Sequence, residues 1–213
     1  MKTDELIAML ARSVEAVDAG SSTRTFAGYV ALGSAFAFAL MLAALGLNPM
    51  LRAYLGEPMF WTKLAFGVGL AASSLWLMAR LARPGRALGA SAFVPIVPVV
   101  ALWLLAAYAL AVAPAGQRAA LIWGQTWKTC LVGIPLLSVP TLIATLLAVR
   151  AMAPARPVWT GAVAGAVAGG VGAAVYALHC PELAAPFLAA WYVGTASIPV
   201  VVGALVGRFA LRW

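Results

Sequence analysis

Two cysteines carry most of the chemistry that this sequence could perform. Cys130 and Cys180 are the only two in the chain, and the single histidine, His179, and an acid, Glu182, lie beside the second of them. Two thiolates with an imidazole and a carboxylate could hold zinc in a tetrahedral site, and thiolates also bind other soft metal ions. The two thiols could instead form a disulfide, or each could be a small buried apolar side chain. The residues alone leave these possibilities open.

The rest of the chain contains few of the titratable residues that an enzyme would need. There are one histidine and six acidic residues, and four of the acids stand within the first 18 positions. General acid–base catalysis needs titratable groups gathered in one place. No catalytic triad, metal-binding helix or phosphate-binding loop is visible. We therefore expect a protein that is not an enzyme and requires no cofactor, although zinc or another soft metal ion could bind at the cysteine pair.

The composition indicates that these residues belong to a membrane protein. Of 213 residues, 64% are hydrophobic and 9% are charged, whereas soluble domains are roughly 45–50% apolar and about 25% charged. Such a chain needs lipid as its solvent. Its net charge of +8 is scattered between apolar runs, which argues against direct nucleic-acid binding. The predicted fold class is an all-α integral membrane protein, a bundle of six transmembrane helices.

Six apolar stretches are long enough to cross a hydrocarbon core of about 30 Å. They are Phe26–Leu47, Phe60–Ala79, Ala92–Ala113, Thr129–Val149, Val158–Leu178 and Phe187–Gly207. Within them stands one charged residue, Lys63, which we expect to extend to the membrane surface. Transporters that couple to ions need more intramembrane charges than this. The tryptophans near the ends of these stretches are expected to anchor them at the lipid headgroups.

The distribution of lysine and arginine predicts the orientation. Most basic residues fall on the side that carries both chain ends, and the positive-inside rule places that side in the cytoplasm. The basic residues on that side are Lys2, Arg12, Arg24, Arg80, Arg83, Arg86, Arg150, Arg156, Arg208 and Arg212; those on the other side are Arg52, Lys63, Arg118 and Lys128. The fourth stretch then begins, and the fifth ends, on the outer side. Cys130 and Cys180 should therefore lie at similar depth at the outer rim, which in a bacterium faces the oxidising periplasm.

The first 24 residues differ from the rest of the chain. They carry more acids than bases, and apolar residues recur among them at helical spacing from Leu6 to Val17. Thr3 can cap this helix, and Gly20 to Thr23 read as a short flexible tether. An isolated helix of this length is marginal in water, so its apolar face needs a partner protein or, as the alternative, the membrane surface. The acidic face favours the partner protein, because anionic lipid would repel it. We expect residues 1–24 to be a cytoplasmic partner-binding segment and residues 25–213 to be the transmembrane domain.

Glycines four residues apart line the fifth stretch at Gly161, Gly165 and Gly169, and Gly203 and Gly207 repeat the spacing in the sixth. Such strips let two helix backbones approach closely. We expect packing within one chain, with a homodimer as the alternative.

These features together resemble the NrsF-like family of membrane anti-sigma factors. The resemblance covers essentially the whole chain and is carried by the opening Met1-Lys2-Thr3-Asp4-Glu5-Leu6-Ile7, by a cysteine near the start of the fourth stretch, and by Leu178-His179-Cys180-Pro181-Glu182. It implies a bacterial inner-membrane protein that sequesters an extracytoplasmic-function sigma factor. Asp4, Glu5, Leu6, Ile7 and Leu10 would then contact the sigma factor. Cys130 and Cys180 would respond to metal or oxidative stress, with the transcriptional stress response following from release.

Two other functions fit the bare composition. A channel or transporter for a small neutral solute needs no intramembrane charge, and solute flux in proteoliposomes would reveal it. A thiol enzyme that passes electrons to quinone is less well supported, because such enzymes usually need more than one cysteine pair.

Overall fold

A computed structural model describes residues 3, 5, 19–81, 89–152 and 154–212, and every regular element in these ranges is helical. The α-helices are α2 (Ala19–Ala44), α3 (Leu51–Tyr54), α4 (Pro58–Leu81), α5 (Ile96–Val112), α6 (Ala115–Trp123), α7 (Trp127–Arg150), α8 (Pro157–Tyr176), α9 (Ala185–Phe187) and α10 (Val193–Ala210). A 3₁₀ turn at Gly89–Phe93 precedes α5, and a π-helical turn at Leu188–Tyr192 joins α9 to α10.

Each of the six expected stretches contains a helix. Five helical segments, among the described residues, are long and apolar enough to cross a membrane: Arg24–Ala44, Pro58–Leu81, Ala115–Arg150, Pro157–Tyr176 and Ala185–Ala210. The remaining one, α5, has 17 residues and is shorter than the others. The all-helical class is thus confirmed, together with several helices of membrane-spanning character.

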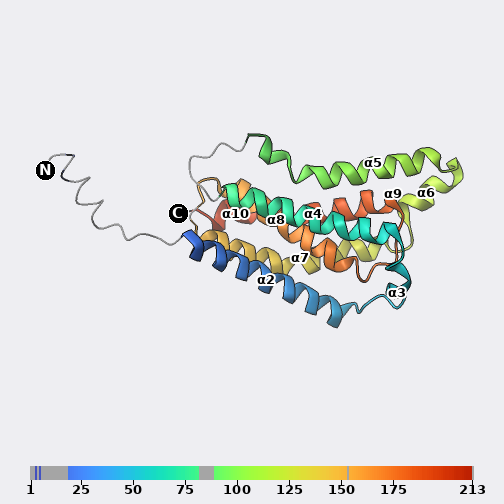
Figure 1. Ribbon diagram of the computed structural model, residues 1–213, viewed down its shortest axis with the longest axis horizontal. Coiled ribbons are helices and arrows are strands. Elements are labelled where there is room, and N and C mark those ends of the chain that lie inside the picture. The colour runs from blue at the N-terminus through green and yellow to red at the C-terminus, as the bar shows by residue number, and fades with distance from the viewer. Residues whose placement is uncertain (1–2, 4, 6–18, 82–88, 153, 213) are drawn as a thin grey trace.

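The helices form an elongated bundle in which α8 is central. It packs against α4, α7 and α10, while α2 lies along α7 (Figure 1). The helix α5 lies at the edge of the bundle and is connected to it at the π-helical turn, where the Trp103 indole donates to the carbonyl of Ala189 at 3.1 Å. The C-terminal residues and the start of α2 are at one end, and α3 and α6 are at the other (Figure 1).

The glycine strip of α8 explains its central position. An added Cβ at Gly161 or Gly165 would collide with the backbone of α10, at Gly203 and Pro199 respectively. On the opposite side, a Cβ at Gly170 would lie 2.5 Å from the backbone nitrogen of Ala71 in α4. The prediction that these glycines pack helices within one chain is therefore confirmed.

The expected tether at the start of the bundle is wrong. Residues 20–23 are the first turns of α2, which runs without interruption from Ala19 to Ala44. Serine and threonine weaken a helix only slightly, and one glycine costs about 1 kcal/mol, so the long apolar helix that follows can carry these residues with it.

Candidate functional site

The two cysteines meet at the end of the bundle where α7 begins and α8 ends. Cys130 is in the first turn of α7, and Cys180 lies in the loop that follows α8. Both are free thiols and both are fully buried. The two thiols belong to one buried cluster, and Cys130 acts on the pKa of Cys180. The alternating direction of the helices predicted their common end, but the structure places them inside the protein and not on an open rim.

Two tyrosines enclose the thiol pair. Tyr176 and Tyr192 belong to the same buried cluster as Cys130 and Cys180. Both rings are fully buried, and within the described residues neither hydroxyl makes a hydrogen bond of ordinary geometry. Gly133 makes room for this arrangement, because a Cβ there would lie 2.5 Å from the Tyr176 ring. The thiols therefore sit in a small polar environment within an apolar core.

Lys63, which lies in α4, completes the polar environment of the two thiols. Its side chain is 0% exposed, and its ammonium donates to the carbonyl oxygens of Cys180 at 2.7 Å and of Glu182 at 3.2 Å. The expectation that this lysine extends to the membrane surface is wrong, because the loop after α8 supplies acceptors inside the bundle. A buried charge in an apolar helix is costly, and such residues commonly mark functional sites.

The charge of Lys63 acts on the nearer thiol. The pKa of Cys180 is lowered, first because Cys130 donates a hydrogen bond to its sulfur, and further because the Lys63 ammonium is close. Burial acts in the opposite direction and is outweighed. Cys180 is therefore the thiol that ionises more readily, and a thiolate is the form that attacks oxidants and binds metals.

Glu182 is committed to a structural contact. Its Oε1 accepts hydrogen bonds from the backbone nitrogens of Gln125 at 2.6 Å and Thr126 at 3.2 Å. These amides precede the first turn of α7, where a carboxylate also meets the positive end of the helix dipole. Gly124 permits the close approach, since its φ is +54° and a Cβ there would lie 2.8 Å from the carboxylate oxygen. Glu182 thus fastens the Cys180 loop to α7.

His179 also makes a contact that holds the loop in place. Its Nδ1 lies 3.0 Å from the carbonyl oxygen of Gly46, just after α2. No group of three or more His, Cys, Asp and Glu side chains is placed to hold a metal ion in the ranges that the structure describes. The four-ligand set of Cys130, Cys180, His179 and Glu182 is therefore not assembled, and two thiols alone do not satisfy the tetrahedral preference of zinc.

Three tryptophans gather beside the site. The rings of Trp123, Trp127 and Trp191 have centroids 5.1 to 5.5 Å apart, and the Trp191 indole donates to the carbonyl of Ile122 at 2.9 Å. The sequence predicted separate membrane anchors at these positions. The structure packs these three rings on one another, and Trp123, like Trp61 and Trp159, remains exposed. Anchoring at the lipid headgroups stays a prediction.

The sequence-predicted partner-binding residues lie mostly outside the described ranges. Asp4, Leu6, Ile7 and Leu10 are not described, whereas Thr3 and Glu5 are helical and exposed.

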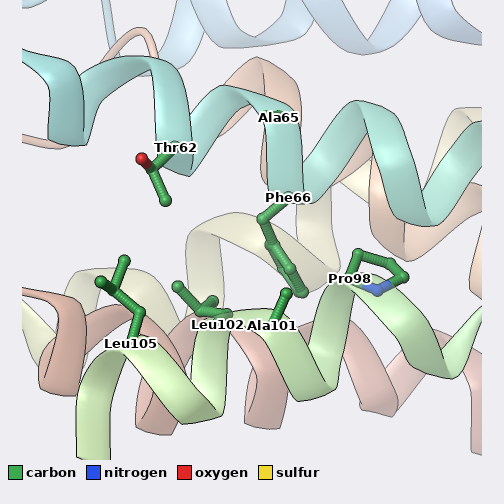
Figure 2. A pocket seen from close by; sticks show the side chains of 7 residues that line it. All are labelled: Thr62, Ala65, Phe66, Pro98, Ala101, Leu102 and Leu105. Carbon is green, nitrogen blue, oxygen red and sulfur yellow. The ribbon is translucent and has the colours of Figure 1, made fainter. Parts of the chain in front are cut away.

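Two clefts lie along α5, away from the thiols. One of about 360 Å³ is between α4 and α5 and is lined by Thr62 and apolar side chains such as Phe66 and Leu102 (Figure 2). The other, of about 470 Å³, lies between α5 and the start of α9. Neither is lined by a charged side chain in the described part of the chain. Both are lined mainly by apolar side chains.

Sequence reasoning missed Lys63, Tyr176 and Tyr192. A signal existed for the lysine, since it is the only charged residue within the six apolar stretches. No comparable signal marked the tyrosines, because amphipathic rings are common near the ends of membrane helices.

Comparison with known proteins identifies the family. The model of the family described as "NrsF: Negative regulator of sigma F" matches residues 10–213. The chain is 44% identical over 216 residues to a protein of Azospira oryzae named "Probable anti-sigma-F factor NrsF", and 36% identical over 220 residues to the "Anti-sigma-F factor NrsF" of Caulobacter vibrioides. Both alignments cover 100% of each chain. No solved structure gives a significant match.

The family is regulatory and not enzymatic, in agreement with the scarcity of titratable residues. With a family model that matches nearly all of its length and two full-length relatives above 30% identity, the chain belongs to the NrsF family of negative regulators of sigma F.

Proposed function

We propose that this chain is a membrane anti-sigma factor that holds an extracytoplasmic-function sigma factor with residues 1–24 and releases it when Cys130 and Cys180 react. The observation that carries the proposal is a pair of fully buried thiols that belong to one cluster of the core, in a member of this family. Contact with the sigma factor is assigned to Asp4, Glu5, Leu6, Ile7 and Leu10. Their acidic and apolar side chains suit a basic, partly apolar surface of a DNA-binding protein.

The proposed location is the bacterial inner membrane. Five long apolar segments and the shorter α5 would form six spans. The start of α2 and the C-terminal residues lie at one end of the bundle (Figure 1). The basic residues Arg80, Arg150 and Arg208 are in the last turns of α4, α7 and α10, which end there as well. By the positive-inside rule that end is cytoplasmic and the cysteine end is periplasmic.

The chemistry of the signal follows from the two thiols. In oxidation, the pair transfers two electrons and two protons to a two-electron acceptor as one S–S bond forms. Alternatively, a soft metal ion takes both sulfurs as thiolates and the two thiol protons leave. Cys180, with its lowered pKa, is expected to react first, and Cys130 then completes the bond.

Release requires that the reacted pair favour a bundle state that binds the sigma factor less well. A tenfold loss of affinity corresponds to about 1.4 kcal/mol. A disulfide stabilises a folded protein against unfolding by about 2–4 kcal/mol, and metal binding by thiolates also contributes folding free energy. Release needs only a fraction of an energy of this size to differ between the two bundle states.

A pull-down from detergent-solubilised native membranes tests the first half of the proposal. The intact chain should capture a sigma factor, and a chain that lacks residues 2–18 should not. A chain with residues 2–18 in scrambled order is the matched control for length and charge. Equal capture by all three would refute the assignment of this segment.

The second half is tested by replacing both cysteines. The Cys130→Ser and Cys180→Ser double variant should retain the sigma factor but fail to release it on treatment with an oxidant or a thiol-binding metal. Ser197→Ala, which alters a hydroxyl on α10 whose hydrogen bond is to Gly194, controls for loss of a small polar group elsewhere. Normal release from the double variant would eliminate the sensing role.

A further inference from the structure

One helix connects the two regions that the proposed function must couple. The described part of α2 begins at Ala19, within the proposed sigma-binding residues 1–24, and ends at Ala44. At a rise of 1.5 Å per residue, its 26 residues span about 39 Å. Because α2 is continuous, a displacement at one end is carried to the other without a flexible joint.

The far end of α2 is hydrogen-bonded to the cysteine loop. Nδ1 of His179 lies 3.0 Å from the carbonyl oxygen of Gly46, and the amide of Asn48 donates to the carbonyl of Leu178 at 3.1 Å. A carbonyl can only accept, so Nδ1 must carry the proton. Gly46 has a φ of +75°, the left-handed conformation typical of the residue that ends a helix. The contact therefore joins the C-terminus of α2 to the residue next to Cys180.

The packing of α2 permits it to move as a unit. Only 17% of its membrane-spanning window is buried, compared with 67% for α8. Its buried residues form a single narrow stripe of Gly33, Ala37 and Met41. Contact along a single stripe, two of whose three residues are glycine and alanine, allows small sliding between two helices. Among the long helices α2 is thus the one held most lightly by the bundle.

We propose that His179 is a positioning residue that couples the state of the cysteine pair to α2, and through α2 to residues 1–18. This inference rests on the proposed function, because it assigns the route by which the thiols change sigma-factor binding. When the sulfurs of Cys130 and Cys180 join, the Cys180 loop shifts, the contact of His179 with Gly46 changes, and α2 moves along α7. His179 thereby acts without contacting the metal or the oxidant.

The test is the ratio of sigma-factor affinities in the two thiol states. The full chain in lipid nanodiscs would be measured against the sigma factor recovered in the pull-down, first reduced and then oxidised with diamide. Diamide is a diazene that accepts two electrons and two protons at its N=N bond as the disulfide forms. We expect about a tenfold ratio for the unmodified chain, within the usual range of allosteric coupling.

His179→Phe removes the donor but keeps an aromatic ring beside Tyr176, whose centroid is 5.7 Å from the imidazole. In this variant the ratio of reduced to oxidised sigma-factor affinity should fall to about one. Thiol counting should show that both cysteines still oxidise. His179→Asn places an amide nitrogen where Nδ1 was, and should restore the ratio. Trp61→Phe removes a comparable side-chain bond, to the carbonyl of Leu55, and should leave the ratio unchanged.

The outcomes separate this inference from the proposed function. An unchanged ratio in His179→Phe, with a ratio of one in the cysteine double variant, overturns the His179 route alone. A tenfold ratio in the cysteine double variant would overturn cysteine sensing and, with it, this inference.

A second measurement does not depend on any variant that could misfold. The amide of Asn48 should change its hydrogen-exchange rate when the unmodified chain is oxidised, because its bond to the carbonyl of Leu178 is part of the contact. Identical exchange across residues 45–50 in both thiol states would also overturn the proposal.

Discussion

Replacing Glu182 with alanine removes the acceptor that fastens the cysteine loop to α7. In the structure one carboxylate oxygen receives the backbone amides of Gln125 and Thr126, and it also lies 3.4 Å from the Thr126 hydroxyl. Alanine leaves both amides without this partner. Because Cys130 follows within one turn of these amides, the substitution also loosens the position of one thiol relative to the other.

The expected cost can be worked from these contacts. A hydrogen bond to a charged group contributes about 1.5–3 kcal/mol. The amide of Gln125 is on an exposed residue and can turn to water, so its share is small, whereas Thr126 is half-buried. The favourable placement at the start of α7 adds about 0.3–1 kcal/mol. We therefore expect Glu182→Ala to destabilise the protein by about 2–4 kcal/mol, or about 4–16 °C in Tm for a chain of this size.

The assay is thermal unfolding of the purified chain in detergent, followed by tryptophan fluorescence. The cluster of Trp123, Trp127 and Trp191 lies beside the contact and should report its loss. Glu182→Gln is the matched variant, because it keeps an oxygen acceptor but no charge. Charged hydrogen bonds are roughly twice as strong as neutral ones, so glutamine should lose about half of what alanine loses.

Two results would refute this reasoning. A Tm for Glu182→Ala within about 1 °C of the unmodified chain would show that the hydrogen bonds of Glu182 to Gln125 and Thr126 contribute nothing measurable to stability. Equal losses for glutamine and alanine would show that the charge alone matters, as expected of a metal ligand and not of a hydrogen-bond acceptor.

Two further predictions concern the packing and the thiols. Gly165→Val should force α8 and α10 apart, because the added atoms meet the backbone of α10; overpacking costs about 1–3 kcal/mol and should lower Tm, whereas Gly194→Ala, with open space around it, should not. An unaltered Tm in the valine variant would contradict the close approach. Cys130→Ala removes the hydrogen bond that lowers the pKa of Cys180, so the thiolate absorbance of Cys180 should appear at higher pH than the first thiolate of the unmodified chain. Since that pKa is lowered on folding, the thiolate stabilises the unmodified chain above the ordinary thiol pKa of about 8.5, and this contribution is lost as the pH falls through the folded value. A Cys180 titration midpoint that is unchanged or lower in the Cys130→Ala variant would argue against a hydrogen bond from Cys130.

The sequence by itself determined the helical class and the common end of the two cysteines. Long runs of apolar residues can satisfy their backbone polar groups in lipid only as helices, and successive spans must alternate in direction. That alternation places the start of α7 and the end of α8 together, and hence Cys130 near Cys180, without any knowledge of side-chain contacts. Glycine spacing likewise predicted the close packing of α8, because close approach of two backbones depends on the local absence of a side chain.

The tertiary structure alone decided the partners of the polar residues around the thiols. Lys63 is 117 positions from Cys180, and His179 is 133 positions from Gly46. A hydrogen bond is made with whichever donor or acceptor the packed helices bring within about 3 Å, and residue type does not select that partner in advance. Two residues that could have ligated zinc, His179 and Glu182, therefore fasten the loop to the end of α2 and to the start of α7.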